Sequence, residues 1–383
     1  MRIGVEEALA WAAVSQKLVS AETSAAEAGD GLDIAAIVDG IGGLGASLNH
    51  VPYLSLAARS RQFQPSALAE DQQSPRPRLV RVSGPDAGSL LAPVGRVPAL
   101  ARLAAHTGRD EADRLLAPLA TEEVQAIVRW ISSAIQSVGK TYPELRKDAP
   151  AAMLRPIERG SERALHQEMA LQQVLQALVL HGEVVTTLEG GLNTSEGPYR
   201  YHLRQRLSPG PLPPVEDCYE AIAERYIHAF APVTVRDFMA WSGLSDYAAR
   251  RAVGGIPTPL RAIEVPGVGE DLLAPESFLS RGPLDGPVCC ILPWLDHWLQ
   301  AYVGVERFSP SGVPADLADR DLVLLSLGPD VPANHSLAAR IRMVGSARKP
   351  RFQPELWRVL AEHEQAALED GLERISRMFE TIR

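Results

Sequence analysis

The sequence predicts an α+β protein, mainly helical, with tandem winged-helix modules followed by a mixed C-terminal unit of strands and one long helix. Three observations predict this class. Amphipathic helices are followed by a pair of short strand-like segments, and this order recurs three times along the chain. Apolar residues form 46% of the 383 residues and occur in short runs separated by charge. After residue 286 the pattern changes to short strands and a final helix.

The first module is predicted over residues 1–115. Apolar residues recur at helical spacing in three segments, residues 6–19, 33–41 and 52–61. Gly42 and Gly43 end the second helix, so residues 44–51 are expected to be a helix-to-helix connection. An extended arm that becomes a strand and a second strand follow, in residues 74–83 and 89–94.

The second and third modules repeat this order over residues 116–212 and 213–285. The second is predicted to contain helices at residues 122–138, 142–147 and 162–181 and strands at 183–187 and 199–203. The third is predicted to contain helices at residues 217–230, 234–241 and 245–253 and strands at 261–265 and 271–274. Thr234 with Asp237 resembles a capping box, which supports a helix start there. The Pro-rich residues 208–214 are interpreted as a linker.

The C-terminal unit, residues 286–383, is predicted to be mixed. Its apolar, β-branched runs indicate short strands, at residues 288–292, 322–327 and 337–344. A long amphipathic pattern follows the last strand. It predicts a helix over residues 354–379.

Composition excludes several classes of protein. A net charge of −9 counts against a protein that coats nucleic acid indiscriminately, so any DNA binding must use local basic patches. No apolar run is long enough to span a bilayer, and acids stand where an export signal would be apolar, so we expect a cytoplasmic protein. No metal or cofactor is expected, because the three cysteines lack metal-site spacing and no nucleotide-binding glycine motif occurs.

Three segments resemble the AlkZ and YcaQ type of winged-helix DNA glycosylase: residues 41–59, 225–245 and 292–302. The likeness covers nearly the whole chain. It implies a monomeric hydrolase that removes bulky alkylated or crosslinked bases from duplex DNA. Members of this family act in DNA repair, or in self-resistance beside genes for genotoxic natural products.

The chain departs from the family at the catalytic motif. The family has Gln-x-Gln or Gln-x-Asp after Gly-Gly-Leu, and here Gly45-Ala46-Ser47 stands in that place. Ser47 offers one short hydroxyl, whereas Asn49 has an amide and His50 can act as a base. The candidate catalytic residues are therefore Ser47, Asn49 and His50. Asp39 is the closest carboxylate upstream. The alternative is that Asn49 and His50 are ordinary turn residues.

Basic residues near two predicted strand pairs are candidates for DNA contacts. Residues 340–351 contain five cations and no acid, which suits phosphate contact, although a charged strand edge has the same pattern. The candidate DNA-binding residues are Arg59, Arg200, Arg204, His335, Arg340, Arg342, Arg348, Lys349 and Arg351. Trp294, His297 and Trp298 resemble an aromatic wall, although such residues after a strand are usually core.

Two other functions remain open at the sequence level. Loss of the Gln pair is also compatible with a catalytically deficient protein that binds DNA or an adduct. A winged-helix transcription regulator would normally bind as a symmetric dimer, which three non-identical modules in one chain make less attractive.

Overall fold

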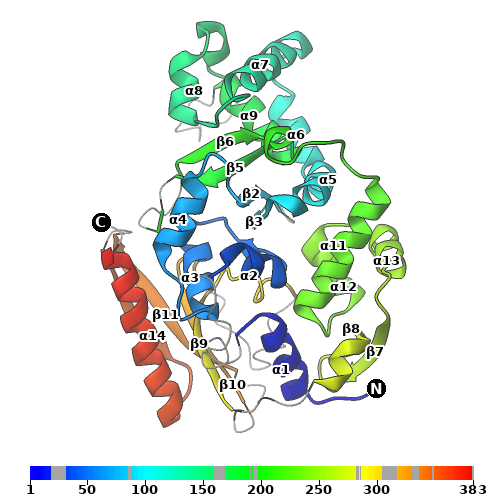
Figure 1. Cartoon of the computed structure of the whole chain (residues 1–383), viewed down its shortest axis with the longest axis vertical. Coiled ribbons are helices and arrows are strands. Elements are labelled where there is room, and N and C mark those ends of the chain that lie inside the picture. The colour runs from blue at the N-terminus through cyan, green and yellow to red at the C-terminus, as the bar shows by residue number, and fades with distance from the viewer. Residues whose placement is uncertain are drawn as a thin grey trace.

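Figure 1 shows the computed structural model of the chain. The structure describes residues 1–18, 32–84, 88–157, 169–189, 191–192, 197–281, 284, 286–303, 317–328, 331, 336–346 and 349–381. Statements below concern these residues. None of the helices among them is long and apolar enough to cross a membrane.

A six-stranded antiparallel sheet joins the first two predicted modules. Its strands are β1 (Leu44–Gly45), β2 (Leu79–Ser83), β3 (Ser89–Pro93), β4 (Lys140–Thr141), β5 (Val184–Leu188) and β6 (Tyr199–Leu203). Their order is β1-β3-β2-β5-β6-β4. The two halves meet where β2 pairs with β5, at Arg81 opposite Thr186. The first and second predicted modules therefore share one sheet, and neither has a separate sheet of its own.

Helices flank this sheet and extend beyond it. They are α1 (Val5–Ser15), α2 (Ile34–Gly40), α3 (His50–Arg59), α4 (Pro65–Gln73), α5 (Val97–Thr107), α6 (Arg109–Leu116), α7 (Thr121–Ala134), α8 (Tyr142–Asp148), α9 (Ala170–Leu180) and α10 (Arg204–Leu207), with short 3-10 turns at Val94–Arg96 and Ala151–Leu154. Figure 1 shows α7, α8 and α9 together at one end of the molecule. The sequence analysis assigned no element to α4, α5 or α6.

The third predicted module has three helices followed by an antiparallel strand pair. These are α11 (Val215–Phe230), α12 (Val235–Ser242), α13 (Asp246–Gly254), β7 (Leu260–Val265) and β8 (Gly269–Pro275), followed by a 3-10 turn at Glu276–Ser280. The expected capping box is present, since the Thr234 hydroxyl accepts the Asp237 amide and the Asp237 carboxylate accepts the Thr234 amide. Gly243 ends α12 with φ of 70°, a conformation that favours glycine.

The C-terminal unit is a four-stranded antiparallel sheet with a helix beside it. Its elements are β9 (Val288–Pro293), β10 (Leu322–Leu327), β11 (Leu337–Ser346), β12 (Lys349–Leu356) and α14 (Glu362–Thr381), and the strand order is β12-β11-β10-β9. The prediction of a helix from residue 354 was wrong, because Pro354 belongs to β12 and pairs with Ile341. The helix begins later, where the Glu364 carboxylate accepts the Ala361 amide and two bonds from Arg358.

The core crosses the predicted module boundaries. The largest apolar cluster combines α1 with α11, α12 and α13 and with β9 and β10. Trp11 of α1 is fully buried and meets Phe278 edge to face, with ring centroids 6.3 Å apart. Burial of aromatic area of this kind dominates core energetics. The N-terminal helix therefore fixes the third module against the C-terminal sheet.

Candidate functional site

The loop that carries Gly45-Ala46-Ser47 is the edge of the large sheet. Strand β1 pairs with β3, so that Gly45 lies opposite Leu90. The Ala46 amide donates to the Ser89 carbonyl at 2.7 Å, and Arg81 Nε donates to the Ala46 carbonyl at 2.9 Å. The predicted helix-to-helix connection is therefore a short strand, held from two sides.

A pocket of about 330 Å³ opens beside this loop. Its lining comes from the loop, the β2–β3 turn, α12 and the turn after β9: Gly45, Ser47, Gly84, Gly88, Ser89, Leu90, Trp241, Leu295, His297 and Gln300. The volume lies at the lower end of the range for small-molecule sites. We call it the loop pocket, and it is the candidate site because the family motif position lies in its wall.

Gly45 leaves no room for a side chain. A Cβ at this position would lie 2.5 Å from the carbonyl oxygen of Leu295, which is backbone and cannot rotate away. The glutamine that the resemblance places here is thus excluded by the turn after β9. The chain therefore departs from the family motif in two ways: glycine replaces glutamine, and the Leu295 carbonyl occupies the space that the glutamine side chain would need.

Gly45→Ala is expected to lower the free energy of unfolding by about 1–3 kcal/mol, because overpacking forces the backbone to shift. Gly45→Gln should be worse and should not restore an amide to the pocket. Gly95→Ala is the control, since nothing lies within 4 Å of a Cβ there. Urea titration of the three variants measures the difference. Equal stability of Gly45→Ala and Gly95→Ala would contradict the steric argument.

His297 is a neutral positioning residue at the floor of the loop pocket. Trp241 Nε1 donates to its Nε2 at 2.6 Å, and an indole N–H can only donate. Nε2 must therefore be the acceptor, and Nδ1 carries the proton to the Gly43 carbonyl, 3.2 Å away. Burial lowers the pKa of His297 to about 4. The ring joins α12 to the glycines that precede the loop, and it is not protonated at neutral pH.

Ser47 and Gln300 place polar groups at the pocket wall. Both residues are exposed. Gln300 Nε2 donates to the Trp294 carbonyl at 2.9 Å, and this bond orients the amide so that Oε1 remains an acceptor. The sequence analysis missed Gln300, although it lies within the 292–302 segment that carried the resemblance. Of the aromatic residues in that segment, Trp298 is buried core.

Asn49 and His50 do not line the loop pocket. They stand at the start of α3, and both are buried. Burial, with a smaller contribution from the nearby Arg320 charge, lowers the pKa of His50 to about 4. Asp39 is also occupied, in ion pairs with Arg96 and Arg225. Of the three catalytic candidates, the structure brings only Ser47 to the pocket.

A buried ion pair supports the turn that closes the pocket. Arg59 Nη1 and Nη2 donate to the two carboxylate oxygens of Asp296, at 2.7 and 2.8 Å, and neither side chain is exposed. Ser55 Oγ donates to the same carboxylate at 2.5 Å, and Gln16 Oε1 accepts from Arg59 at 2.9 Å. The predicted DNA contact of Arg59 is wrong for this reason: its charge is used inside the protein.

The other DNA-binding candidates divide by exposure. Arg340 is buried in an ion pair with Asp321, which conflicts with its predicted DNA contact. Arg200 is half-buried and pairs with Glu189 and Glu144, and its DNA contact stays a prediction. Arg204 is half-buried and donates to the Ser208 carbonyl at 3.3 Å. The exposed members are Arg342, Lys349 and Arg351. His335 and Arg348 lie outside the described residues.

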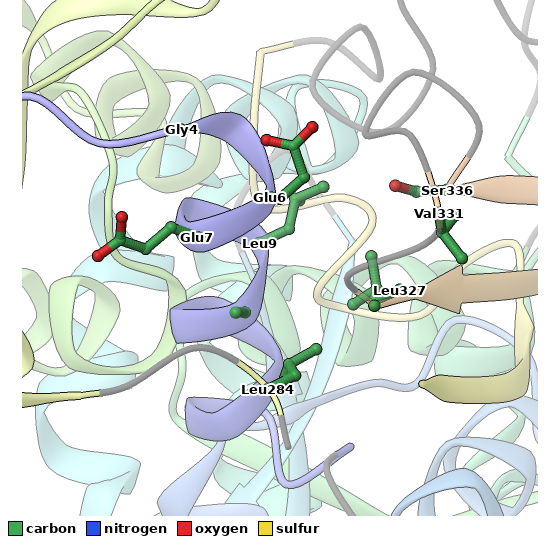
Figure 2. A pocket seen from close by; sticks show the side chains of 10 residues that line it. Gly4, Glu6, Glu7, Leu9, Leu284, Leu327, Val331 and Ser336 are labelled. Carbon is green, nitrogen blue, oxygen red and sulfur yellow. The ribbon is translucent and has the colours of Figure 1, made fainter. Parts of the chain in front are cut away.

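A larger pocket of about 430 Å³ lies beside α1, and its chemistry does not suit DNA. Figure 2 shows Leu9 and Leu284 projecting from different segments toward Leu327, with the Glu6 carboxylate at the rim. The apolar walls offer a phosphate group no hydrogen bond, and the carboxylates repel its negative charge. Among the residues described, no group of His, Cys, Asp and Glu could hold a metal ion.

Acid is expected to weaken the fold between about pH 6.5 and pH 4. Burial lowers the pKa of His50, His202 and His297 to about 4, so the unfolded chain takes up protons first as the pH falls. The contribution of these neutral histidines to the free energy of unfolding is fully present above pH 6.5. As the pH falls to 4, each histidine lowers the free energy of unfolding by up to about 3 kcal/mol. Urea unfolding at pH 7.5, 6.0 and 5.0 measures this loss. A constant free energy of unfolding over that range would contradict it.

A family model and a solved structure match the chain. Residues 38–378 match the family model described as DNA glycosylase AlkZ-like. The fold is similar to that of the Streptomyces sahachiroi DNA glycosylase AlkZ, with a TM-score of 0.70 and 16% sequence identity over 99% of this chain and 98% of that chain. No curated protein sequence matches the chain significantly.

Proposed function

Because the chain belongs to the AlkZ-like DNA glycosylase family, we propose that it hydrolyses the N-glycosidic bond of bulky alkylated purines in duplex DNA. Its setting would be DNA repair or self-resistance to a genotoxic natural product. The observation that carries the proposal is the loop pocket. Its wall contains Gly45 and Ser47, which stand at the position of the family's catalytic motif, and the family model matches residues 38–378. The proposal retains the winged-helix interpretation, since α11, α12, α13 and the β7–β8 pair follow that order.

The reaction needs modest catalysis. An alkylated purine already carries positive charge, so the bond between the sugar carbon and the base nitrogen breaks with its electron pair going to the base. A water oxygen then bonds to the sugar carbon and releases a proton. The protein must position this water and stabilise the developing sugar cation.

In the proposal, Gln300 and Ser47 hold the water in place of the missing glutamine pair. Gln300 Oε1 accepts one hydrogen of the water, because Nε2 is committed to the Trp294 carbonyl. The Ser47 hydroxyl accepts or donates a second hydrogen bond. Gly45 contributes only backbone, since the Leu295 carbonyl fills the space for a side chain.

The exposed cations of the β11–β12 hairpin are proposed as contacts to the DNA backbone. Arg342, Lys349 and Arg351 are exposed, and only Arg342 has an ion-pair partner among the described residues, Glu355 at 4.0 Å. Contacts of this kind position a protein on DNA without reading sequence. Within the described residues the patch thus consists of these three cations, and Arg348 lies outside them.

The function is tested with two duplexes, one with a single bulky N7-alkylguanine and one with N7-methylguanine. Mass spectrometry measures the free base, and alkaline cleavage measures the abasic site. Release from the bulky duplex, with equal amounts of both products, supports the proposal. Release from the methyl duplex alone would contradict the bulky substrate class.

The second candidate is an adduct-binding protein without hydrolysis. The closed wall at Gly45 favours it, because the family's water-holding side chain cannot be present there. In the same assay this protein would retain the bulky duplex in a filter-binding measurement and leave its base in place.

A further inference from the structure

A small pocket outside the loop pocket gathers positive charge. It has a volume of about 190 Å³ and lies between the C-terminal ends of α1 and α3, strand β9 and helix α14. Its charged side chains are Lys17, Arg61, Asp370 and Arg374, together with Arg59, which Asp296 already neutralises. We call it the cationic pocket. Three cations thus face one carboxylate.

The charges of the cationic pocket are not compensated within the described part of the chain. Lys17, Arg61 and Arg374 form no ion pair there within 4.0 Å. Arg374 Nε is shielded from solvent and has no hydrogen-bond partner among these residues. Leaving a buried donor of a charged group without an acceptor is unfavourable, because the group loses its hydrogen bond to water and gains none in the protein. A bound acceptor would remove this penalty.

The cations are also held near one another. Burial lowers the pKa of Arg374, the Asp370 carboxylate opposes this shift, and the nearby Arg61 charge adds a smaller lowering. Lys17 has a φ of 55°, which is uncommon for a non-glycine residue, and the end of its side chain, Cε and Nζ, lies beside Gly40 of α2. Backbone outliers of this kind cluster at functional sites. The fold thus holds the positive charges of the cationic pocket close together, although free side chains of like charge would move apart.

We propose that the cationic pocket binds a phosphate group. A tetrahedral oxyanion accepts several hydrogen bonds and matches the arginine fork. The volume is below the range of about 300–1,000 Å³ for larger ligands, which favours a small anion. The pocket lies at the end of α3 away from the loop pocket, about 15 Å along the helix by its ten residues. The proposal therefore does not depend on base release.

Calorimetric titration with inorganic phosphate, at a chloride-matched ionic strength, tests the proposal on the full chain. Arg374→Ala is expected to weaken binding at least tenfold. Asp370→Asn should tighten it severalfold, because the only acid of the pocket is removed. Arg377→Ala, on the same helix but exposed and paired with Glu373, should bind like the wild type.

Two results would overturn the proposal. One is that the wild type binds no phosphate and that Arg61→Ala also leaves duplex binding unchanged. The other is an equal loss in Arg374→Ala and Arg377→Ala. If Arg374→Ala does not fold, Arg61→Ala serves in its place, since Arg61 is exposed.

A second arm identifies the source of the phosphate. If it belongs to the DNA backbone, Arg61→Ala should reduce the slope of log affinity for duplex against log salt by about 0.9. If it is free phosphate or a phosphate monoester, wild type and Arg61→Ala should share one slope while phosphate binding differs between them. Either outcome supports the pocket as a phosphate site.

Discussion

Replacing Asp296 with alanine is expected to lower the free energy of unfolding by about 3–5 kcal/mol. The carboxylate accepts two bonds from Arg59 and one from Ser55, and it lies out of contact with water. Removal of one partner leaves the Arg59 charge buried and uncompensated, which is the costly way to break such a pair. Urea unfolding followed by linear extrapolation measures the loss.

The matched control is an exposed ion pair. Glu373→Ala removes the partner of Arg377 on the surface of α14, where solvent screens such pairs and they contribute little to stability. Replacing both Arg59 and Asp296 with apolar residues should recover much of the loss, because no charge then remains buried. If Asp296→Ala is no less stable than Glu373→Ala, the ion pair does not support the turn as we describe.

Gln300→Ala is expected to lower single-turnover base release about 10²-fold, the scale for loss of one positioned group at a reaction centre. Affinity for the duplex should change little, because Gln300 is not a phosphate contact in this account. Gln300→Glu keeps an acceptor oxygen and should retain more activity than the alanine variant. Rapid mixing with excess protein isolates the chemical step from product release.

Gln365→Ala is the control for this variant. Gln365 lies on α14, donates to Glu369 and does not line the loop pocket. It should release base at the wild-type rate. A full rate in Gln300→Ala would remove this residue from the reaction and leave Ser47 as the polar group to test.

Sequence reasoning recovered the family because three local segments carried its resemblance. It also placed many elements well, since β6 and β10 begin and end where the periodicity predicts. Local signals sufficed there: alternation for β6, an apolar run for β10 and a capping box for α12. Such signals depend on neighbours in the chain.

Long-range contacts were beyond the sequence. In the sequence Arg59 and Arg340 resemble surface cations, but the fold buries them in ion pairs with Asp296 and Asp321. The closed wall at Gly45 depends on Leu295, some 250 residues later. The last residues of β12 were predicted to start a helix, because Pro354 is also a common first helical residue, and only the pairing with β11 shows that they are a strand. The pairing of β2 with β5 could likewise not be read from either module alone.

Base release by the wild type and by a Ser47→Ala, Gln300→Ala double variant tests the central claim most directly. Both proteins are held in excess over one duplex with a single bulky N7-alkylguanine, at concentrations where both bind it fully. The account predicts a single-exponential appearance of free base from the wild type and release near the spontaneous rate from the double variant. Equal rates in the two proteins, or a bound duplex that the wild type leaves intact, would contradict it.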